Sequence, residues 1–247
     1  MSRLRTLGEL NLVYGRRRGR RLRPGRERLL QELLPKIAVT TSDIPSTPSL
    51  WFDVSIRDIW LEIGFGAGEH LAAQAAAHPD VGFIGCEPFR NGVAHLLARI
   101  DGDGLRNVRI YPDDARLLLK ALPSCSIDRT FLLFPDPWPK TRHHRRRIIA
   151  AETLRDLSRT MKQGSELRLA SDDVGYVRWM LYHTLNDGGF EWLAHRPDDW
   201  RRRPSDWPPT RYEMKALDRG DDCYFLQFCR TSSTGAVPGD ITLDSKG

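Results

Sequence analysis

Residues 61–68 read Leu-Glu-Ile-Gly-Phe-Gly-Ala-Gly, and this stretch decides the fold class. It continues the apolar run Ile59–Ile63, which is typical of a buried strand, and it precedes the helical pattern of Glu69–Ala77. Glycine has no Cβ, so the three glycines allow a sharp turn and let a ligand lie against the backbone. The segment therefore predicts a strand, a ligand-binding turn and a helix.

Short apolar runs alternate with helical patterns along the rest of the chain, which is typical of a parallel sheet covered by helices. The runs predict seven strands, at Ile59–Ile63, Val81–Cys86, Val108–Tyr111, Ile127–Phe134, Leu167–Ala170, Phe190–Ala194 and Tyr224–Cys229. The patterns between them predict helices at Glu69–Ala77, Phe89–Ile100, Ala115–Leu122, Arg145–Met161 and Val174–Asp187. The predicted fold class is α/β, with a seven-stranded, mostly parallel sheet and helices on both faces. We assign residues 1–50 to a basic arm and lead-in, 51–231 to the α/β domain and 232–247 to a disordered tail.

The composition excludes several classes of protein. Hydrophobic residues make up 40% of the 247 positions and charged residues 28%, which is typical of a globular domain. The longest strongly apolar stretches, such as Phe131–Phe134, are far shorter than the roughly 20 residues that cross a bilayer. The four cysteines form no Cys-x-x-Cys pair and have no zinc-type spacing with histidine. We therefore expect a cytoplasmic protein with no membrane contact and no metal.

The positive charge is concentrated at the amino terminus. The net charge is +6, but residues 1–28 hold ten arginines and two glutamates, leaving 28 basic and 30 acidic residues in the other 219. Clustered guanidinium groups bind polyanions by neutralising phosphates and releasing counterions. A second basic run, from Lys140 to Arg147, contains no acidic residue. Both segments predict contacts with a nucleic acid.

Glu87 ends the second predicted strand, 25 residues after Glu62. At the carboxyl edge of such a sheet, a carboxylate can accept hydrogen bonds from both hydroxyls of a ribose. This spacing also suits a nicotinamide cofactor. However, the third glycine comes early and Glu69 adds negative charge where a diphosphate would bind. S-adenosylmethionine carries a sulfonium instead of a diphosphate, so we expect it as the cofactor.

Acidic residues also follow the third and fourth strands. Asp113 and Asp114 stand where a carboxylate could accept a hydrogen bond from an adenine amino group, and either could instead cap the next helix. Residues 134–140 read Phe-Pro-Asp-Pro-Trp-Pro-Lys, and three prolines predict a rigid shelf. Asp136 and Trp138 on this shelf could bind a nucleobase, or the turn could simply cover the core.

The segment 207–215 reads Trp-Pro-Pro-Thr-Arg-Tyr-Glu-Met-Lys. A threonine hydroxyl, an arginine fork and a glutamate carboxylate at this spacing could bracket the edge of a purine. By residue type alone, the segment could equally be a surface turn.

Taken together, these segments resemble the bacterial tRNA (guanine-N7-)-methyltransferase family of the TrmB type, from about Arg16 to Cys229. The most specific matches are L-E-I-G-F-G-A-G-E, F-P-D-P-W-P-K followed by basic residues, and P-T-R-Y-E. The resemblance implies a class I, Rossmann-like methyltransferase fold. It also implies S-adenosylmethionine as the methyl donor, tRNA as the partner, and methylation of the variable-loop guanosine at tRNA position 46.

The resemblance also implies roles for individual residues. The implied cofactor contacts are Glu62, Gly64, Gly66, Gly68, Glu87, Asp114 and Asp136, of which Asp136 is also implied to be catalytic. The implied substrate contacts are Lys140, Asp172, Thr210, Arg211, Tyr212 and Glu213. The implied RNA contacts are Arg142, Arg145, Arg146 and Arg147, with Arg17, Arg18 and Arg20 in the arm. Since Ser171-Asp172-Asp173 stands where the family usually has Thr-Asp, either aspartate could hold the substrate role.

Three alternatives stay open, one of them the nicotinamide-dependent dehydrogenase that the spacing of Glu62 and Glu87 would also suit. Asp136-Pro137-Trp138 is similar to the Asp/Asn-Pro-Pro-aromatic motif of methyltransferases that act on exocyclic base amines. A non-catalytic RNA-binding protein could also retain this fold. On the preferred hypothesis, removing residues 1–24 should weaken tRNA binding and leave S-adenosylmethionine binding intact.

Overall fold

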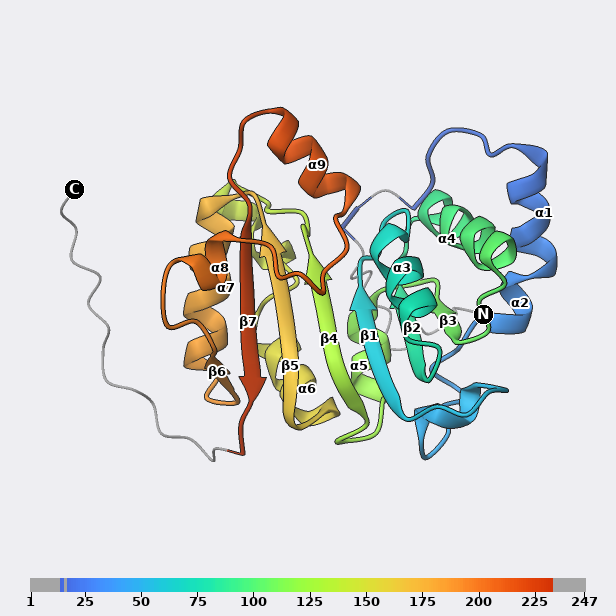
Figure 1. Ribbon diagram of the computed structural model, residues 1–247, viewed down its shortest axis with the longest axis horizontal. Coiled ribbons are helices and arrows are strands. Elements are labelled where there is room, and N and C mark those ends of the chain that lie inside the picture. The colour runs from blue at the N-terminus through green and yellow to red at the C-terminus, as the bar shows by residue number, and fades with distance from the viewer. Residues whose placement is uncertain (1–13, 16, 233–247) are drawn as a thin grey trace, which may run out of the picture.

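Seven strands form one sheet in the computed structural model, which describes residues 14–15 and 17–232 (Figure 1). The sheet order is β3-β2-β1-β4-β5-β7-β6, and β7 is the strand that runs antiparallel to its neighbours. The strands are β1 (Asp58–Ile63), β2 (Val81–Cys86), β3 (Val108–Tyr111), β4 (Ile127–Leu133), β5 (Met161–Ser171), β6 (Phe190–Trp192) and β7 (Tyr224–Arg230). The predicted fold class is confirmed. The predicted tail, apart from Ser232, lies outside the described residues.

Helices cover both faces of the sheet (Figure 1). One face carries α1 (Pro24–Glu32), α2 (Leu34–Ile37), α3 (Glu69–Ala77), α4 (Arg90–Asp103) and α9 (Arg211–Asp218). The other face carries α5 (Ala115–Ala121), α6 (Ala151–Thr160) and α7 (Val174–Asn186). Shorter helical segments are η1 (Pro48–Trp51), η2 (Thr141–Arg146) and α8 (Asp198–Arg201). Two hydrophobic cores result, one on each side of the sheet.

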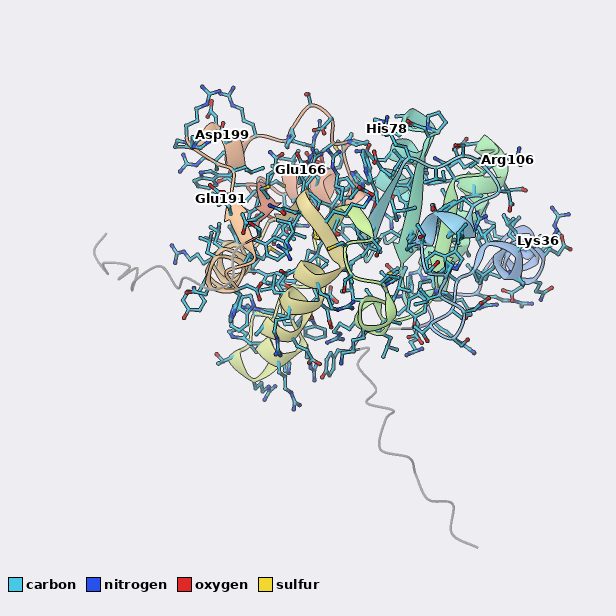
Figure 2. All side chains as sticks on the ribbon, turned by 90° about the horizontal axis from the view of Figure 1, so that it is seen from below. Lys36, His78, Arg106, Glu166, Glu191 and Asp199 are labelled. Carbon is cyan, nitrogen blue, oxygen red and sulfur yellow. The ribbon has the colours of Figure 1, made fainter. Side chains whose placement is uncertain are left out.

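The lead-in packs against the domain and shares its core. Leu29, Leu30 and Leu33 contact the core beneath α3 and α4, and Ala38 forms a bridge to Ile110 of β3. Figure 2 shows Lys36 of α2 at one end of the molecule and Glu191 of β6 at the other. The lead-in helices therefore lie beside the β3 edge of the sheet.

The sequence predicts one helix over Arg145–Met161, and this prediction is wrong. The chain forms η2, then an extended stretch, and only then α6, while Met161 begins β5. Ile149 in the break is fully buried. The burial of Ile149 in the core goes with the break between η2 and α6, so tertiary packing overrides the local helical pattern here.

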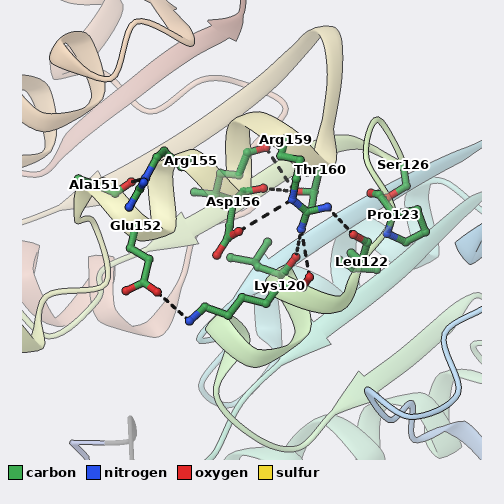
Figure 3. Close-up of polar contacts among 12 residues, drawn as sticks. Lys120, Leu122, Pro123, Ser126, Ala151, Glu152, Arg155, Asp156, Arg159 and Thr160 are labelled. Atoms are coloured by element: carbon green, nitrogen blue, oxygen red, sulfur yellow. Dashed lines mark hydrogen bonds and ion pairs between the residues drawn. The ribbon is translucent and has the colours of Figure 1, made fainter. Parts of the chain in front are cut away.

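Arg159 ties α6 to the end of α5 (Figure 3). Its Nη1 donates to the carbonyl oxygen of Leu122 at 2.7 Å, and its Nη2 donates to that of Lys120 at 3.3 Å. The last carbonyls of a helix have no partner within the helix, and a guanidinium is well suited to supply one. This contact holds two helices of one face in register.

Among residues 14–15 and 17–232, no helix is both long and apolar enough to cross a membrane. In the same described ranges, no three His, Cys, Asp or Glu side chains gather where they could hold a metal ion.

Candidate active site

A cavity of about 490 Å³ opens at the carboxyl edge of the sheet, where β1 and β4 are neighbours and the strand order reverses. Ligands of doubly wound folds bind at this switch point, because the loops that follow the two strands diverge there. The segments after β1, β2, β3 and β4 all contribute to its wall. The predicted site residues that line the cavity are Gly64, Gly66, Glu87, Asp114, Asp136, Arg146 and Tyr212.

The glycine turn leaves space for a ligand at the end of β1. Gly64 and Gly66 have φ angles of +73° and +58°, a region that side chains rarely adopt. A Cβ on Gly66 would also come within 3.1 Å of the Tyr212 ring. Gly68 does not line the cavity: it precedes α3 and packs against Leu96.

Glu87 is buried directly after β2. Its Oε2 accepts a hydrogen bond from the Gly66 N–H at 2.8 Å, and its Oε1 accepts one from the Phe89 N–H at 2.9 Å. Burial raises the pKa of Glu87 to about 7, because desolvation outweighs the two backbone hydrogen bonds. Each carboxylate oxygen can accept a further hydrogen bond, so the group is fixed and can still bind a pair of hydroxyls.

Asp114 combines a helix cap with a place in the cavity wall. It caps α5 by accepting a hydrogen bond from the Arg116 N–H at 3.0 Å, and it lines the cavity. Its Oδ2 also accepts a 2.6 Å hydrogen bond from the Arg116 guanidinium. The neighbouring Asp113 instead accepts a hydrogen bond from Nη2 of Arg17 at 3.0 Å.

The shelf at residues 134–140 has an unusual backbone. Phe134 and Trp138 have φ angles of +52° and +44°, which is rare for aromatic residues. Such strain persists where the surroundings impose it, often at functional sites. Asp136 between them is exposed and lines the cavity, while the Trp138 ring lies 4.8 Å from the Arg146 guanidinium carbon. The shelf thus presents a carboxylate and a flat aromatic ring beside the cavity.

Arg147 supports this shelf from inside the protein. It is 5% exposed, and its Nε donates a 2.8 Å hydrogen bond to the carbonyl oxygen of Pro137. Its guanidinium carbon lies 5.0 Å from the Tyr176 ring and 4.6 Å from the Trp179 ring. A buried guanidinium cannot reach RNA, so the structure corrects the predicted RNA contact at Arg147. Lys140, Arg142 and Arg145 are exposed beside the shelf.

The arm is docked along the start of α4. The Arg90 N–H donates to the Arg17 carbonyl at 3.0 Å, and the Gly19 N–H donates to Oδ1 of Asn91 at 2.9 Å. Nδ2 of Asn91 donates in return to the carbonyl oxygen of Arg20 at 2.7 Å. The side chains of Arg18 and Arg20 remain exposed.

This docking brings Tyr14 and Gly15 to the cavity wall. The Tyr14 ring lies 5.7 Å from the Arg116 guanidinium carbon and 5.5 Å from that of Arg146. No motif in the sequence marks Tyr14, because its role depends on contacts with residues a hundred or more positions away. The arm therefore contributes to the cavity wall, and this position predicts that its removal also affects cofactor binding.

The remaining predicted residues lie around the cavity without lining it. Asp173 caps α7 by accepting a hydrogen bond from the Tyr176 N–H, whereas Asp172 pairs with Arg219 at 2.8 Å. Both aspartates therefore have partners in the structure, and either could hold the substrate role.

Thr210 and Glu213 form a capping box that begins α9, and Glu213 is buried and paired with Arg203. Arg211 and Tyr212 between them are exposed. The segment that could be a surface turn is therefore a helix start, and it carries Tyr212 to the cavity.

Comparison with known proteins identifies relatives of this chain. The family described as "Putative methyltransferase" matches residues 57–226. A tRNA (guanine-N(7)-)-methyltransferase of Rhodospirillum rubrum is 49% identical over 232 residues, covering 92% of this chain and 91% of its own. One of Jannaschia sp. is 48% identical over 224 residues, covering 89% and 94%.

Solved structures show the same fold at low sequence identity. A variant of the 16S rRNA (adenine(1408)-N(1))-methyltransferase of Catenulisporales acidiphilia is 15% identical, with a TM-score of 0.51 over 73% of this chain and 88% of its own. The aminoglycoside resistance methyltransferase NpmB1 is 16% identical, with a TM-score of 0.50 over 76% and 95%.

The sheet order, the glycine turn and the carboxylates at the switch point define a class I methyltransferase. The cosubstrate of this class is S-adenosylmethionine, and the wall fits it, because it carries three carboxylates, those of Glu87, Asp114 and Asp136, against two guanidinium groups. Within the class, the chain belongs to the tRNA (guanine-N(7)-)-methyltransferase family.

Proposed function

We propose that this protein methylates N7 of the variable-loop guanosine of tRNA, at position 46, with S-adenosylmethionine as the donor. The observation that carries the proposal is the cavity itself. It joins three carboxylates, a glycine turn and the strained shelf at one edge of the sheet. A cytoplasmic location goes with this proposal, because tRNA and the donor meet there.

Each of these residues would bind a different part of the donor. Glu87 would accept hydrogen bonds from the ribose hydroxyls, because both of its oxygens are fixed at the wall by backbone N–H groups. Asp114 would face the adenine, and Gly64 and Gly66 leave the backbone open to the ligand. Glu62, on β1, would hold the donor's ammonium group from beneath the turn.

Asp136 would act on the guanine. The donor supplies an electrophilic methyl group on a sulfonium. N7 has a lone pair and no proton, so no side chain has to act as a base. The protein must instead align the two groups and stabilise the positive charge that develops on the purine. Asp136 would accept hydrogen bonds from the Watson–Crick edge and offset this charge, while Trp138 offers a stacking face.

Exposed cations beside the shelf would hold the tRNA backbone. Lys140, Arg142 and Arg145 project from this region, and Arg18 and Arg20 project from the docked arm. Phosphate contacts of this kind give affinity and orientation without reading sequence.

The test is a single-turnover assay on unmodified tRNA with labelled donor, followed by nucleoside digestion and mapping of the methyl group. We expect 7-methylguanosine at position 46. Asp136→Asn should slow the step by about 100- to 1000-fold with donor and tRNA saturating. Asp101→Asn, which removes an exposed carboxylate from α4, is the matched control and should keep the wild-type rate.

Each failure has a distinct meaning. A near-normal rate for Asp136→Asn would refute its catalytic role. A methylated exocyclic amine would favour a methyltransferase that acts on exocyclic base amines, and tRNA binding without methyl incorporation would favour a non-catalytic RNA-binding protein.

A further inference from the structure

A buried chain of hydrogen bonds runs from the end of β1 to the loop before α9. Oε2 of Glu62 lies 2.7 Å from Nδ1 of His70, in the first turn of α3. One turn further along the helix, Nε2 of Gln74 lies 3.4 Å from Nε2 of His70 and 2.8 Å from the carbonyl oxygen of Asp206. Glu62, His70 and Gln74 are 5%, 2% and 2% exposed.

The donor and acceptor roles in this chain follow from its chemistry. The side-chain nitrogen of Gln74 can only donate, and it has two hydrogens for two neighbours, the Asp206 carbonyl and Nε2 of His70. Nε2 of His70 is then the acceptor, so Nδ1 carries the hydrogen, and the Nδ1–H donates a hydrogen bond to the Glu62 carboxylate. Gln74 therefore fixes the histidine tautomer, and the histidine orients the carboxylate.

The histidine ring is also held sterically. It packs edge-on against Phe131 of β4, with the ring centroids 4.7 Å apart. Phe131 in turn contacts Trp207, the residue after Asp206. The ring thus has little freedom to rotate away from Glu62.

Neither end of this chain lines the cavity, but each end adjoins a segment that does. Glu62 is two residues before Gly64, which lines the cavity. Asp206 lies in the loop between α8 and α9. Tyr212 of α9 lines the cavity next to Gly66. The carboxylate before the glycine turn is thus linked, through His70 and Gln74, to the loop that leads to Tyr212.

We propose that His70 is a positioning residue for methyl transfer: it holds the Glu62 carboxylate oriented toward the donor, and Gln74 fixes its tautomer from Asp206. This inference rests on the proposed function, in which Glu62 binds the ammonium group of S-adenosylmethionine. It explains why an imidazole is fully buried beneath the glycine turn without lining the cavity.

The test is calorimetric titration of the full-length protein with S-adenosylmethionine. His70→Leu removes the hydrogen bond to a charged group, so the donor Kd should rise about 10- to 100-fold. His70→Asn keeps an N–H donor near the position of Nδ1 and should recover most of the affinity. The double variant His70→Leu, Gln74→Leu should bind no more weakly than His70→Leu, because both residues act through Glu62.

Asn107→Ala separates positioning from general destabilisation. Asn107 is equally buried and holds the other end of α3, donating to the carbonyl oxygens of Ala75 and His78 at 3.0 Å. This variant should lower the melting temperature and leave the donor Kd unchanged.

Two results would overturn the inference: wild-type donor affinity in His70→Leu, or an equal loss of affinity in Asn107→Ala. If His70→Leu folds poorly, the donor affinity of His70→Asn is compared with that of the wild type instead. A wild-type protein that binds no donor would instead overturn the proposed function.

Discussion

Oε2 of Glu87 accepts a 2.8 Å hydrogen bond from the backbone N–H of Gly66, so the end of β2 is tied to the turn that follows β1. Two of the segments that form the cavity wall, those after β1 and β2, are therefore joined through one carboxylate. Its ionisation connects the pH to the binding of the donor.

Donor affinity should rise with pH through the pKa of Glu87. Burial raises this pKa from 4.5 to about 7, so the contribution of Glu87 to folding stability is present below pH 4.5 and is lost as the pH rises toward 7. A cationic, hydroxyl-bearing donor should bind the ionised form. The Kd should therefore fall about tenfold between pH 6 and pH 8, as measured by calorimetry.

Glu87→Gln is the control for this pH dependence. The side chain of the variant cannot ionise, so its donor Kd should be high and nearly constant across the same pH range. If the tenfold change persisted in the variant, the titrating group would be another residue.

Arg145 and Arg147 should behave differently although they are two positions apart. Arg145 is exposed, so Arg145→Ala should weaken tRNA binding and reduce the slope of log K against log salt by about 1, with unchanged stability. Arg147→Ala removes a buried hydrogen bond to Pro137 and should cost about 2–3 kcal/mol of stability. Salt-dependent binding and chemical denaturation measure the two effects, and equal behaviour would contradict the assignment.

The arm should contribute to donor binding as well as to tRNA binding. Removing residues 1–20 deletes Tyr14 from the cavity wall and breaks the Arg17–Asp113 ion pair. We expect a severalfold higher donor Kd together with weaker tRNA binding.

A charge-neutralised arm separates the two roles. The triple variant Arg18→Gln, Arg20→Gln, Arg21→Gln keeps Tyr14 and Arg17, so it should weaken tRNA binding and leave the donor Kd unchanged. An unchanged donor Kd after truncation would show that the arm is dispensable at the wall.

Arg159 should matter for stability and not for catalysis. Arg159→Ala leaves the carbonyls at the end of α5 without their partner and should lower the free energy of unfolding by about 2–3 kcal/mol (Figure 3). Arg155→Ala, on the same helix, loses an exposed 3.4 Å hydrogen bond and solvent-screened charge interactions, and should change stability by less than about 0.5 kcal/mol. The rate of methyl transfer per folded molecule should be unchanged in both.

The strands could be predicted from the sequence because each is a short apolar run bounded by polar or turn residues. Val81–Cys86 and Val108–Tyr111 have the predicted bounds. The helix over Arg145–Met161 could not be predicted correctly. Local pattern favours a continuous helix there, and only packing in the folded chain shows that Arg147 and Ile149 are drawn inside.

The wall residues Glu87, Asp114 and Asp136 could be predicted because each lies in the loop that follows a strand, and parallel strands bring their carboxyl ends to one edge. Tyr14 and His70 could not. Their roles depend on which distant side chains they meet, and no local spacing encodes that.

By itself, the sequence determined the α/β class, the glycine turn, the acidic edge and the basic segments, because periodicity, glycine and charge act over a few residues. Only the tertiary structure decided that the arm forms part of the cavity wall, that Arg147 is buried beneath the shelf and that His70 orients Glu62. The physical reason is that burial and hydrogen-bond partners are set by residues far apart in the chain, whose meeting is fixed by packing.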